Sequence, residues 1–358
     1  MAHRSSARAA YVLSVLSVLS VLCAGCESQA KVGVAEPALA PPTKAIVFAV
    51  GASSATDPLE AGKAAARAAR SQLGPAPVKA VIVSECFEDK ERKQKVLAGV
   101  ESVFPQEVVF GSATYGSFTQ AGPAVGESAA VLAVAGNGIS VASAVQTDLG
   151  AAQLTVDKDM PEIEKRLSAA GKALAARLPK KPDGRLLIVL ADAHSPKNGA
   201  LVAGIRGVVG NDFPITGGSA NKNAGQTFVY CKGQMLTDAA VALLLSGDFR
   251  VAQAGRQAKE NEKILSTANA AAAEALARLG KQGARPAAVV AFDCAGRKGR
   301  VKNVADELAA MQKAIGRKVV LFGTYNAGEI GPPDVSEKLP GVRCAGVGWH
   351  VMFTAVGW

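Results

Sequence analysis

The sequence has few aromatic residues and few histidines, and each shortage excludes a class of function. Phe, Trp and Tyr make up 5% of the 358 residues, which leaves few rings on which unpaired bases could stack. The net charge is +10, but Lys and Arg are spread over helix-like stretches rather than gathered into a patch. We therefore expect a solvated basic surface and no nucleic-acid partner.

Catalytic motifs are also missing. The chain has three histidines and contains no Gly-x-Ser-x-Gly elbow, Walker loop or His-Glu-x-x-His. In "LADAHSP", Asp192, His194 and Ser195 are neighbours, whereas a catalytic triad draws its members from separate segments. Two histidines without clustered acids also argue against a catalytic metal site. We expect no metal, no cofactor and no catalysis.

Long apolar runs are absent from the body, and the run near the N-terminus is short. After a basic start comes "YVLSVLSVLSVL" (11–22), which is shorter than the ~20 residues of a spanning helix and typical of a signal peptide. The following "CAGC" resembles a bacterial lipobox. We expect a signal peptide over 1–25, lipid attachment at Cys26 and a flexible tether over 26–43, with ordinary cleavage near Gly25 as the alternative. The body would then be anchored to a bacterial membrane and face the periplasm or the cell surface.

Cysteine usage leaves the redox state open. Four cysteines follow the leader, namely Cys86, Cys231, Cys294 and Cys344. An exported compartment permits disulfides, but the spacing does not give a pairing, and four free thiols are equally allowed.

The body alternates short apolar runs with Ala-rich amphipathic segments, which is typical of an α/β fold. Three segments share one order: an apolar run that ends in an acid, a helix, and a second run that ends in a Gly-Ser or Gly-Thr turn. Their first and second runs are 30, 30 and 34 residues apart, measured over 81–111, 187–217 and 289–323. We predict repeated β-α-β units with parallel strands, mixed sheets covered by helices, and two related halves. The three acids are Glu85, Asp192 and Asp293.

Paired apolar runs follow the first two units and predict added β-hairpins. Residues 127–147 would turn at "GNG", and residues 226–247 at Lys232-Gly233. The last run, 346–358, is expected to add a closing strand.

Several of these segments together resemble the FIST sensory domain family, named for F-box and intracellular signal transduction proteins. The matching segments are "PITGGSANKNAGQTFVYCKGQMLTDAAVALLLSG" (214–247), "AFDCAGR" (291–297) and "FGTYNAGEIGP" (322–332). Residues 44–250 are similar to the N-terminal part of the family and residues 255–358 to the C-terminal part. The resemblance implies a non-catalytic sensor of small molecules such as amino acids, with a signalling protein as its partner.

Ligands of open α/β sheets bind beyond the carboxyl ends of the strands, where the glycine turns fall. Glycine lets a ligand approach the backbone closely, and hydroxyls with neighbouring amides suit a carboxylate or another small anion. The alternative is that these are only tight turns with local hydrogen bonds. The candidate ligand-binding residues of the turns are Ser112, Tyr115, Gly217, Gly218, Ser219, Thr324, Tyr325 and Glu329.

The segment "FDCAGRKGR" (292–300) adds Asp293, Cys294 and Arg297. A guanidinium can bind a carboxylate through two hydrogen bonds, and an Asp can accept from an ammonium, so the pair would suit a zwitterion. The alternative is an internal Asp–Arg ion pair, with Cys294 as a small buried hydrophobe.

The resulting hypothesis is a lipid-anchored sensory module of the cell envelope that binds a small polar ligand. Two other functions stay open. One is a hydrolase or thiol enzyme that acts on a small ester or amide through His194 and Ser195 or through Cys294. The other is a structural envelope protein that binds a partner.

Overall fold

Three copies of one strand–helix repeat account for most of residues 46–358, the part of the chain that the computed structural model describes. Each repeat runs strand, helix, strand, helix, strand and, later, a returning strand; the four strands lie side by side in the order first, fourth, second, third. Repeat 1 consists of β1 (Val47–Ser53), α1 (Pro58–Leu73), β2 (Val78–Glu85), α2 (Lys90–Glu101), β3 (Val109–Ala113) and β6 (Ala129–Ala135). Repeat 2 consists of β7 (Ile139–Gln146), α3 (Val156–Ala176), β8 (Gly184–Ala191), α4 (Asn198–Val209), β9 (Ile215–Ser219) and β14 (Ala240–Gly247). Repeat 3 consists of β15 (Arg250–Gln257), α5 (Asn261–Gly280), β16 (Pro286–Cys294), α7 (Val304–Ile315), β17 (Val320–Asn326) and β20 (His350–Gly357).

Each repeat contributes a short hairpin that pairs with the sheet of another repeat. The hairpins are β4–β5 (Ser117–Thr119 and Gly122–Ala124), β12–β13 (Val229–Cys231 and Gln234–Leu236) and β18–β19 (Glu329–Gly331 and Ala345–Val347). The hairpin of repeat 1 pairs with β17 of repeat 3, that of repeat 2 with β3 of repeat 1, and that of repeat 3 with β9 of repeat 2. The exchange closes a cycle and gives three six-stranded mixed sheets in the described chain. The short elements left over are η1 (Gln106–Val108), β10 (Lys222–Asn223), β11 (Gln226–Thr227), α6 (Ala295–Lys298) and η2 (Val335–Glu337).

Strand alternation divides the core into a common part and three outer parts. Ile82, Ile188 and Val290, in the middle of β2, β8 and β16, face one core that all three sheets line. Their neighbours along each strand, such as Val81, pack instead against the helices of their own repeat. Because successive side chains of a strand point to opposite faces, both faces of each sheet are buried, which explains the continuous apolar runs in the sequence.

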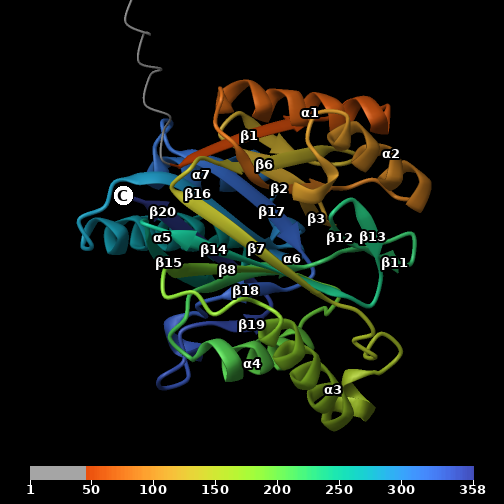
Figure 1. The fold of residues 1–358 in the computed structure, drawn as a ribbon. Helices are drawn as coiled ribbons and strands as arrows, with labels where there is room; N and C mark the ends of the chain where they lie inside the picture. Colours follow the sequence, from red (N-terminus) through yellow and green to blue (C-terminus); the bar gives the residue numbers. More distant parts are fainter. Residues whose placement is uncertain (1–45) are drawn as a thin grey trace, which may run out of the picture. The chain divides into compact units, whose positions relative to one another are not determined.

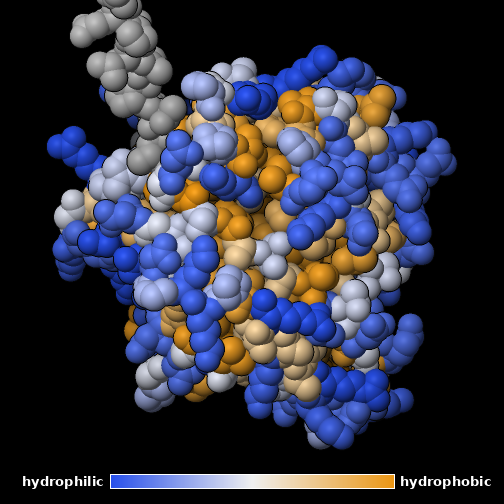
Figure 2. All heavy atoms as spheres, viewed as in Figure 1, coloured by the Kyte–Doolittle hydropathy of each residue, from blue (hydrophilic) through white to orange (hydrophobic). Residues whose placement is uncertain are grey.

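The helix pairs lie on the outer faces of the sheets. Figure 1 shows α1 and α2 in orange, α3 and α4 in green, and α5 with α7 in cyan and blue, on three different sides of the sheets. On the face drawn in Figure 2, apolar residues gather in the middle and polar residues along the margins, over the helices. In the described part of the chain, no helix is long and apolar enough to cross a membrane.

Most of the elements predicted from the sequence are confirmed, and with them the α/β fold of repeated β-α-β units. The pairs β2–β3, β8–β9 and β16–β17 are parallel. Helix α1 has Asp57 as its N-cap, whose side chain accepts from Glu60 N, and Pro58 as its first residue. The two similar regions expected from the sequence, 44–250 and 255–358, are related because both are built from the same repeat. The repeat occurs twice before residue 250 and once from residue 250 onward.

One of the two predicted hairpins is wrong, and the other is shorter than the predicted 226–247, because residues 240–247 form β14 of another sheet. The turn at Lys232-Gly233 does join β12 to β13, but "GNG" does not fold residues 127–147 into a hairpin. β6 pairs with β1 and β2, whereas β7 pairs with β14 in another sheet. Because β6 already has a neighbour on each side, the chain must leave its sheet at Gly136 and begin the next repeat.

Candidate functional site

The carboxyl ends of the parallel strands carry most of the predicted site residues. The strand registers pair Val83 with Gly111, Val189 with Gly217 and Ala291 with Gly323, so these three glycines are equivalent. A Cβ on Gly217 would lie 1.8 Å from the carbonyl oxygen of Val189. Glycine is therefore required there by the close approach of two strands, independently of any ligand.

Two of the three predicted acids are equivalent, and the third is not. Val83, Val189 and Ala291 are the residues opposite the three glycines. Two residues further along each strand, repeat 1 has Glu85, repeat 3 has Asp293 and repeat 2 has Ala191. Asp192 lies one residue further along and accepts from Asp238 N at 2.8 Å. Burial raises the pKa of the Asp192 carboxyl. The three acids therefore do not form a symmetric set.

Glu85 and Lys93 form a fully buried ion pair in repeat 1. The ammonium of Lys93 donates to Glu85 at 3.0 Å, and neither side chain is exposed. Tyr230, from the hairpin of repeat 2, donates its hydroxyl to Glu85 Oε1 at 2.5 Å, and Phe87 N donates to Oε2 at 2.9 Å. The carboxylate is satisfied by the protein itself.

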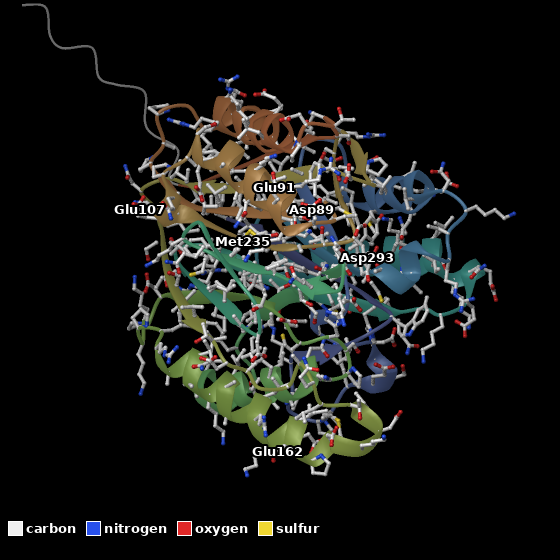
Figure 3. The ribbon with its side chains drawn as sticks, turned by 90° about the vertical axis from the view of Figure 1, so that its right-hand side faces the viewer. Asp89, Glu91, Glu107, Glu162, Met235 and Asp293 are labelled. Atoms are coloured by element: carbon white, nitrogen blue, oxygen red, sulfur yellow. The ribbon has the colours of Figure 1, made fainter. Side chains whose placement is uncertain are left out.

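Asp293 and Arg297 also meet, in the form of the internal ion pair considered from the sequence. Arg297 is fully buried; its Nε donates to Asp293 at 3.0 Å and its Nη2 to Glu307 at 2.8 Å. Nη1 donates to Thr267 Oγ1 at 3.1 Å. Burial, together with the charge of Glu307, raises the pKa of Asp293 well above its usual range, and burial raises the pKa of Glu307. Figure 3 shows Asp293 among the elements of its repeat, whereas Glu162 lies at the periphery on α3.

The hydroxyl turns are buried and bonded within the protein. Ser219 donates its hydroxyl to the carbonyl of Ala193 at 2.7 Å, and Thr324 Oγ1 accepts from Asn326 Nδ2 at 2.9 Å. Ser112 is 3% exposed. Gly218 makes room for Asn326, because a Cβ there would lie 2.4 Å from Asn326 Oδ1.

Tyr115 is the exposed member of the predicted set, and it lies at the seam between repeats 1 and 3. Its backbone N–H donates to the carbonyl of Tyr325 at 2.9 Å, and Tyr325 N donates to Gly116 O at 2.9 Å. The ammonium of Lys298 donates to Tyr115 O and lies 5.4 Å from the centroid of the Tyr325 ring. Burial raises the pKa of the half-buried Cys86 thiol, and the nearby charge of Lys298 partly offsets that shift. The sequence interpretation missed Lys298, although it is the next residue after Arg297 in the quoted segment.

Glu329 lies at the seam between repeats 3 and 2. It is fully buried, and its Oε2 accepts from His350 N at 3.0 Å, while Oε1 has no hydrogen-bond partner among the described residues. Burial raises the pKa of this carboxyl well above its usual range, and the charge of Asp293 adds to the shift. The protonated form of this carboxyl is therefore favoured over the ionised form relative to an exposed glutamate.

The cysteines and histidines do not form a reactive group. All four cysteines of the described chain are free. Burial raises the pKa of the Cys294 thiol to about 12 and that of Cys86 to about 11, so both are thiols at neutral pH. Burial lowers the pKa of His194. Within residues 46–358, no group of three or more His, Cys, Asp or Glu residues is placed to hold a metal ion.

Two sizeable cavities of the described chain lie away from these residues. Two adjoining cavities of about 510 and 520 Å³ share Gly184, Val209 and Phe213, near the amino ends of β8 and β9. None of the predicted site residues lines them. Cys26, the predicted lipid attachment site, lies outside the described residues.

The chain matches the FIST N domain over residues 79–260 and the FIST C domain over residues 232–332. No match was found among curated proteins. Among solved structures it is similar to cyanuric acid hydrolase of A. caulinodans, with a TM-score of 0.44 and 12% identity over 87% of this chain and 100% of that chain. T. maritima PurL in complex with ATP gives a TM-score of 0.26 and 9% identity over 87% of this chain and 71% of that chain. These structural likenesses are too distant to carry an argument. The FIST N domain by itself spans half of the sequence, and the chain belongs to the FIST family of sensory domains.

Proposed function

We propose that this chain is the ligand-binding part of a sensory system and takes a small polar ligand, such as an amino acid, without transforming it. The observation that carries the proposal is the group of side chains at the seam between repeats 1 and 3. Lys298 is half-buried there, Tyr115 is 38% exposed, and Cys86 is half-buried. These residues lie at the carboxyl ends of strands from two repeats, which is where α/β folds bind ligands.

The seam offers both charges that a zwitterion needs. Burial lowers the pKa of the Lys298 ammonium, because desolvation disfavours its charged form. A ligand carboxylate would restore a partner for that charge. Burial raises the pKa of the Tyr115 hydroxyl, and the charge of the nearby, exposed Glu88 adds to the shift. Glu88 can therefore accept from a ligand ammonium at this seam. The Tyr115 ring would pack on the apolar part between them.

Calorimetry and thermal shift with the twenty amino acids and with small acids test this site. A ligand at a hundred times its dissociation constant adds about 2.7 kcal/mol to the free energy of unfolding. Lys298→Met should weaken the binding roughly tenfold or more, since it removes a hydrogen bond between two charged groups. Lys302→Met, an exposed residue four positions further on, is the matched control. A ligand that binds both variants equally well would show that the site is elsewhere.

The thiol and histidine chemistry supports a non-catalytic role. A nucleophilic cysteine needs a lowered pKa, whereas burial raises the pKa of Cys294 to about 12. No hydrogen bond joins His194 to Ser195 among the contacts of the described chain; Ser195 N donates to Ala327 O at 3.0 Å. A screen of esters and amides tests this: turnover that is lost in Ser195→Ala or Cys294→Ala would establish an enzyme instead.

The envelope location is the last part of the proposal. We infer attachment through Cys26 from the "CAGC" that follows the apolar run, with the body facing the periplasm or the cell surface and a signalling protein as its partner. Labelled palmitate should enter the native chain and not Cys26→Ser. Labelling that persists in this variant would exclude the anchor at Cys26.

A further inference from the structure

A small pocket outside the seam sites lies where the β18–β19 hairpin meets the edge of the repeat 3 sheet. Its volume is about 180 Å³. One wall comes from β15 and α5, and the other from the loop between β18 and β19; in Figure 1 this hairpin is drawn in blue beneath β15. The lining residues are Ala252, Gln253, Arg278, Gln282, Pro332, Lys338, Val342 and Arg343.

The loop that builds the second wall is unusually long for its place in the fold. The equivalent hairpins β4–β5 and β12–β13 each turn in two residues, 120–121 and 232–233. The β18–β19 connection instead runs from Pro332 to Cys344. Four of the pocket residues lie on this extension. Long loops in compact domains are more often functional than incidental, and here the added length builds a pocket that the other two repeats lack the chain to form.

The pocket is lined by three cations and no acid, namely Arg278, Lys338 and Arg343. Glu337, next to Lys338 in sequence, accepts from Gln257 Nε2 at 2.8 Å. Outside the lining, Glu274 pairs with Arg256 and with Arg278, so one of the three cations already has an acidic partner. Lys338 and Arg343 have no acidic partner among the described residues, and two like charges in so small a space repel one another. An anion in the pocket would relieve that repulsion.

Donors remain available to such an anion. Arg278 uses Nη1 on the carbonyl of Gln253 at 2.6 Å, and Arg343 uses Nε on Gln253 Oε1 at 3.2 Å. These bonds hold both guanidinium groups in place. Among the described residues, Arg343 Nη2 and the ammonium of Lys338 have no hydrogen-bond or ion-pair partner. Two fixed cations and one movable cation therefore surround a space that is smaller than the 300–1,000 Å³ typical of pockets for larger organic ligands.

We propose that this pocket binds a small oxyanion of the phosphate or sulfate class and thereby fastens the β18–β19 loop to the β15–α5 edge. Since β18 also pairs with β9 of repeat 2, an anion here strengthens the junction between repeats 2 and 3. The site is separate from the Lys298 seam and does not depend on the ligand proposed there.

Binding is tested with inorganic phosphate and sulfate, against chloride at matched ionic strength. In calorimetry, the native chain should bind one phosphate, and Lys338→Ala should weaken that binding about tenfold. Lys338 is exposed, and its side chain makes no hydrogen bond or ion pair among the described residues, so the variant should keep the fold. Lys302→Ala, equally exposed, is the matched control, and Lys298→Met should also keep phosphate binding, which separates this site from the seam.

Trypsin locates the effect on the loop. The Lys338–Leu339 bond lies on the exposed part of the extension, where Leu339 is 61% exposed. Phosphate should slow cleavage at this bond at least several-fold in the native chain, and chloride should not. An equal effect of phosphate and chloride, or equal phosphate binding by the native chain and Lys338→Ala, would overturn the proposal.

Discussion

Glu85 and Asp293 occupy equivalent positions in repeats 1 and 3, and each is neutralised by a different arrangement. Glu85 is balanced by one ammonium, that of Lys93, and by a tyrosine hydroxyl. Asp293 shares the guanidinium of Arg297 with a second carboxyl group, Glu307. The second arrangement holds two acids for one cation. Burial raises the pKa of both carboxyl groups, and the charge of Glu307 raises that of Asp293 further. Equivalent strand ends thus each carry a buried carboxyl group, but in different electrostatic surroundings.

The first prediction concerns Lys93. Lys93→Met leaves Glu85 buried without its cation, and breaking a buried pair in this way costs about 3–5 kcal/mol. Chemical denaturation should show this loss in the free energy of unfolding. Lys95→Met, two residues along the same helix and largely exposed, should leave stability unchanged. A loss of the same size in both variants would mean that the helix, not the ion pair, is responsible.

The second prediction concerns the pH dependence contributed by Glu329. Its pKa is raised in the folded state, by burial first, so between its ordinary pKa and the raised value the folded chain holds one more proton than the unfolded chain. The free energy of unfolding contributed by this group therefore falls as pH rises above about 4.5. Glu329→Gln keeps an acceptor for His350 N and removes the titration.

Denaturation of the native chain and Glu329→Gln at several pH values between 5 and 8 checks this. The variant should gain stability relative to the native chain as the pH rises, with Asp293, Arg297 and His350 unchanged in both. Glu107 is exposed, and Glu107→Gln serves as the control. A constant difference across the range would show that Glu329 is ionised throughout.

The exchanged hairpins consist of short strands, which offer few backbone hydrogen bonds, so we expect their side chains to contribute much of the attachment. Phe118, on the three-residue strand β4, is fully buried, and its ring lies 5.2 Å from that of Tyr325 in repeat 3. Gly323 provides the space, because a Cβ there would lie 2.0 Å from the Phe118 ring.

Three edge strands are protected by side chains that bind their backbone carbonyls. Gln72 donates to a carbonyl on β1, Arg177 to one on β7 and Arg278 to one on β15. Such contacts blunt edges that could pair with another chain.

The third prediction tests this attachment. Phe118→Ala should lower the free energy of unfolding by about 3–5 kcal/mol, a large effect for a residue in a three-residue strand. Val125→Ala lies just after the same hairpin, where Val125 is 39% exposed, and should change little. If both substitutions cost the same small amount in denaturant titration, the hairpin is held by its backbone alone.

At the scale of the whole molecule, the cycle of exchanged hairpins makes the three repeats interdependent. Residues 44–250 contain repeats 1 and 2 but lack β18–β19, which pairs with β9, and lack β17, against which β4 packs. The two FIST regions meet in the sheets themselves, and the common core takes side chains from all three repeats.

The fourth prediction follows from that interdependence. A fragment of residues 44–250 should show no cooperative thermal transition by circular dichroism, since it leaves core surface and strand edges uncovered. Mixing it during refolding with residues 250–358, which hold the whole of repeat 3, should restore a single transition. A fragment that melts cooperatively by itself would show that the N-terminal region is an independent domain.

The candidate site was only partly predictable from its residues. The segment "FDCAGRKGR" indicated an acid and an arginine at a strand end, and both are there. The sequence could not indicate that Glu307 and Thr267 would occupy the remaining donors of Arg297, because those residues lie on two other helices. Lys298 was overlooked because a lysine in a loop is usually solvated, and only the packing of Tyr115 and Tyr325 from two repeats makes this one half-buried.

The sequence by itself determined the elements and their repetition. Apolar periodicity, the Asp57 cap and the spacing of the glycine turns are local signals. They determine helix and strand formation through nearby residues, independently of where the segment lies in the fold. Tertiary structure decided which strand pairs with which. The hydroxyl of Tyr230 reaches Glu85 across 145 residues. "GNG" joins two repeats rather than two neighbouring strands, because a strand edge accepts many partners and the exchange among the repeats decides which hairpin covers β3, β9 and β17.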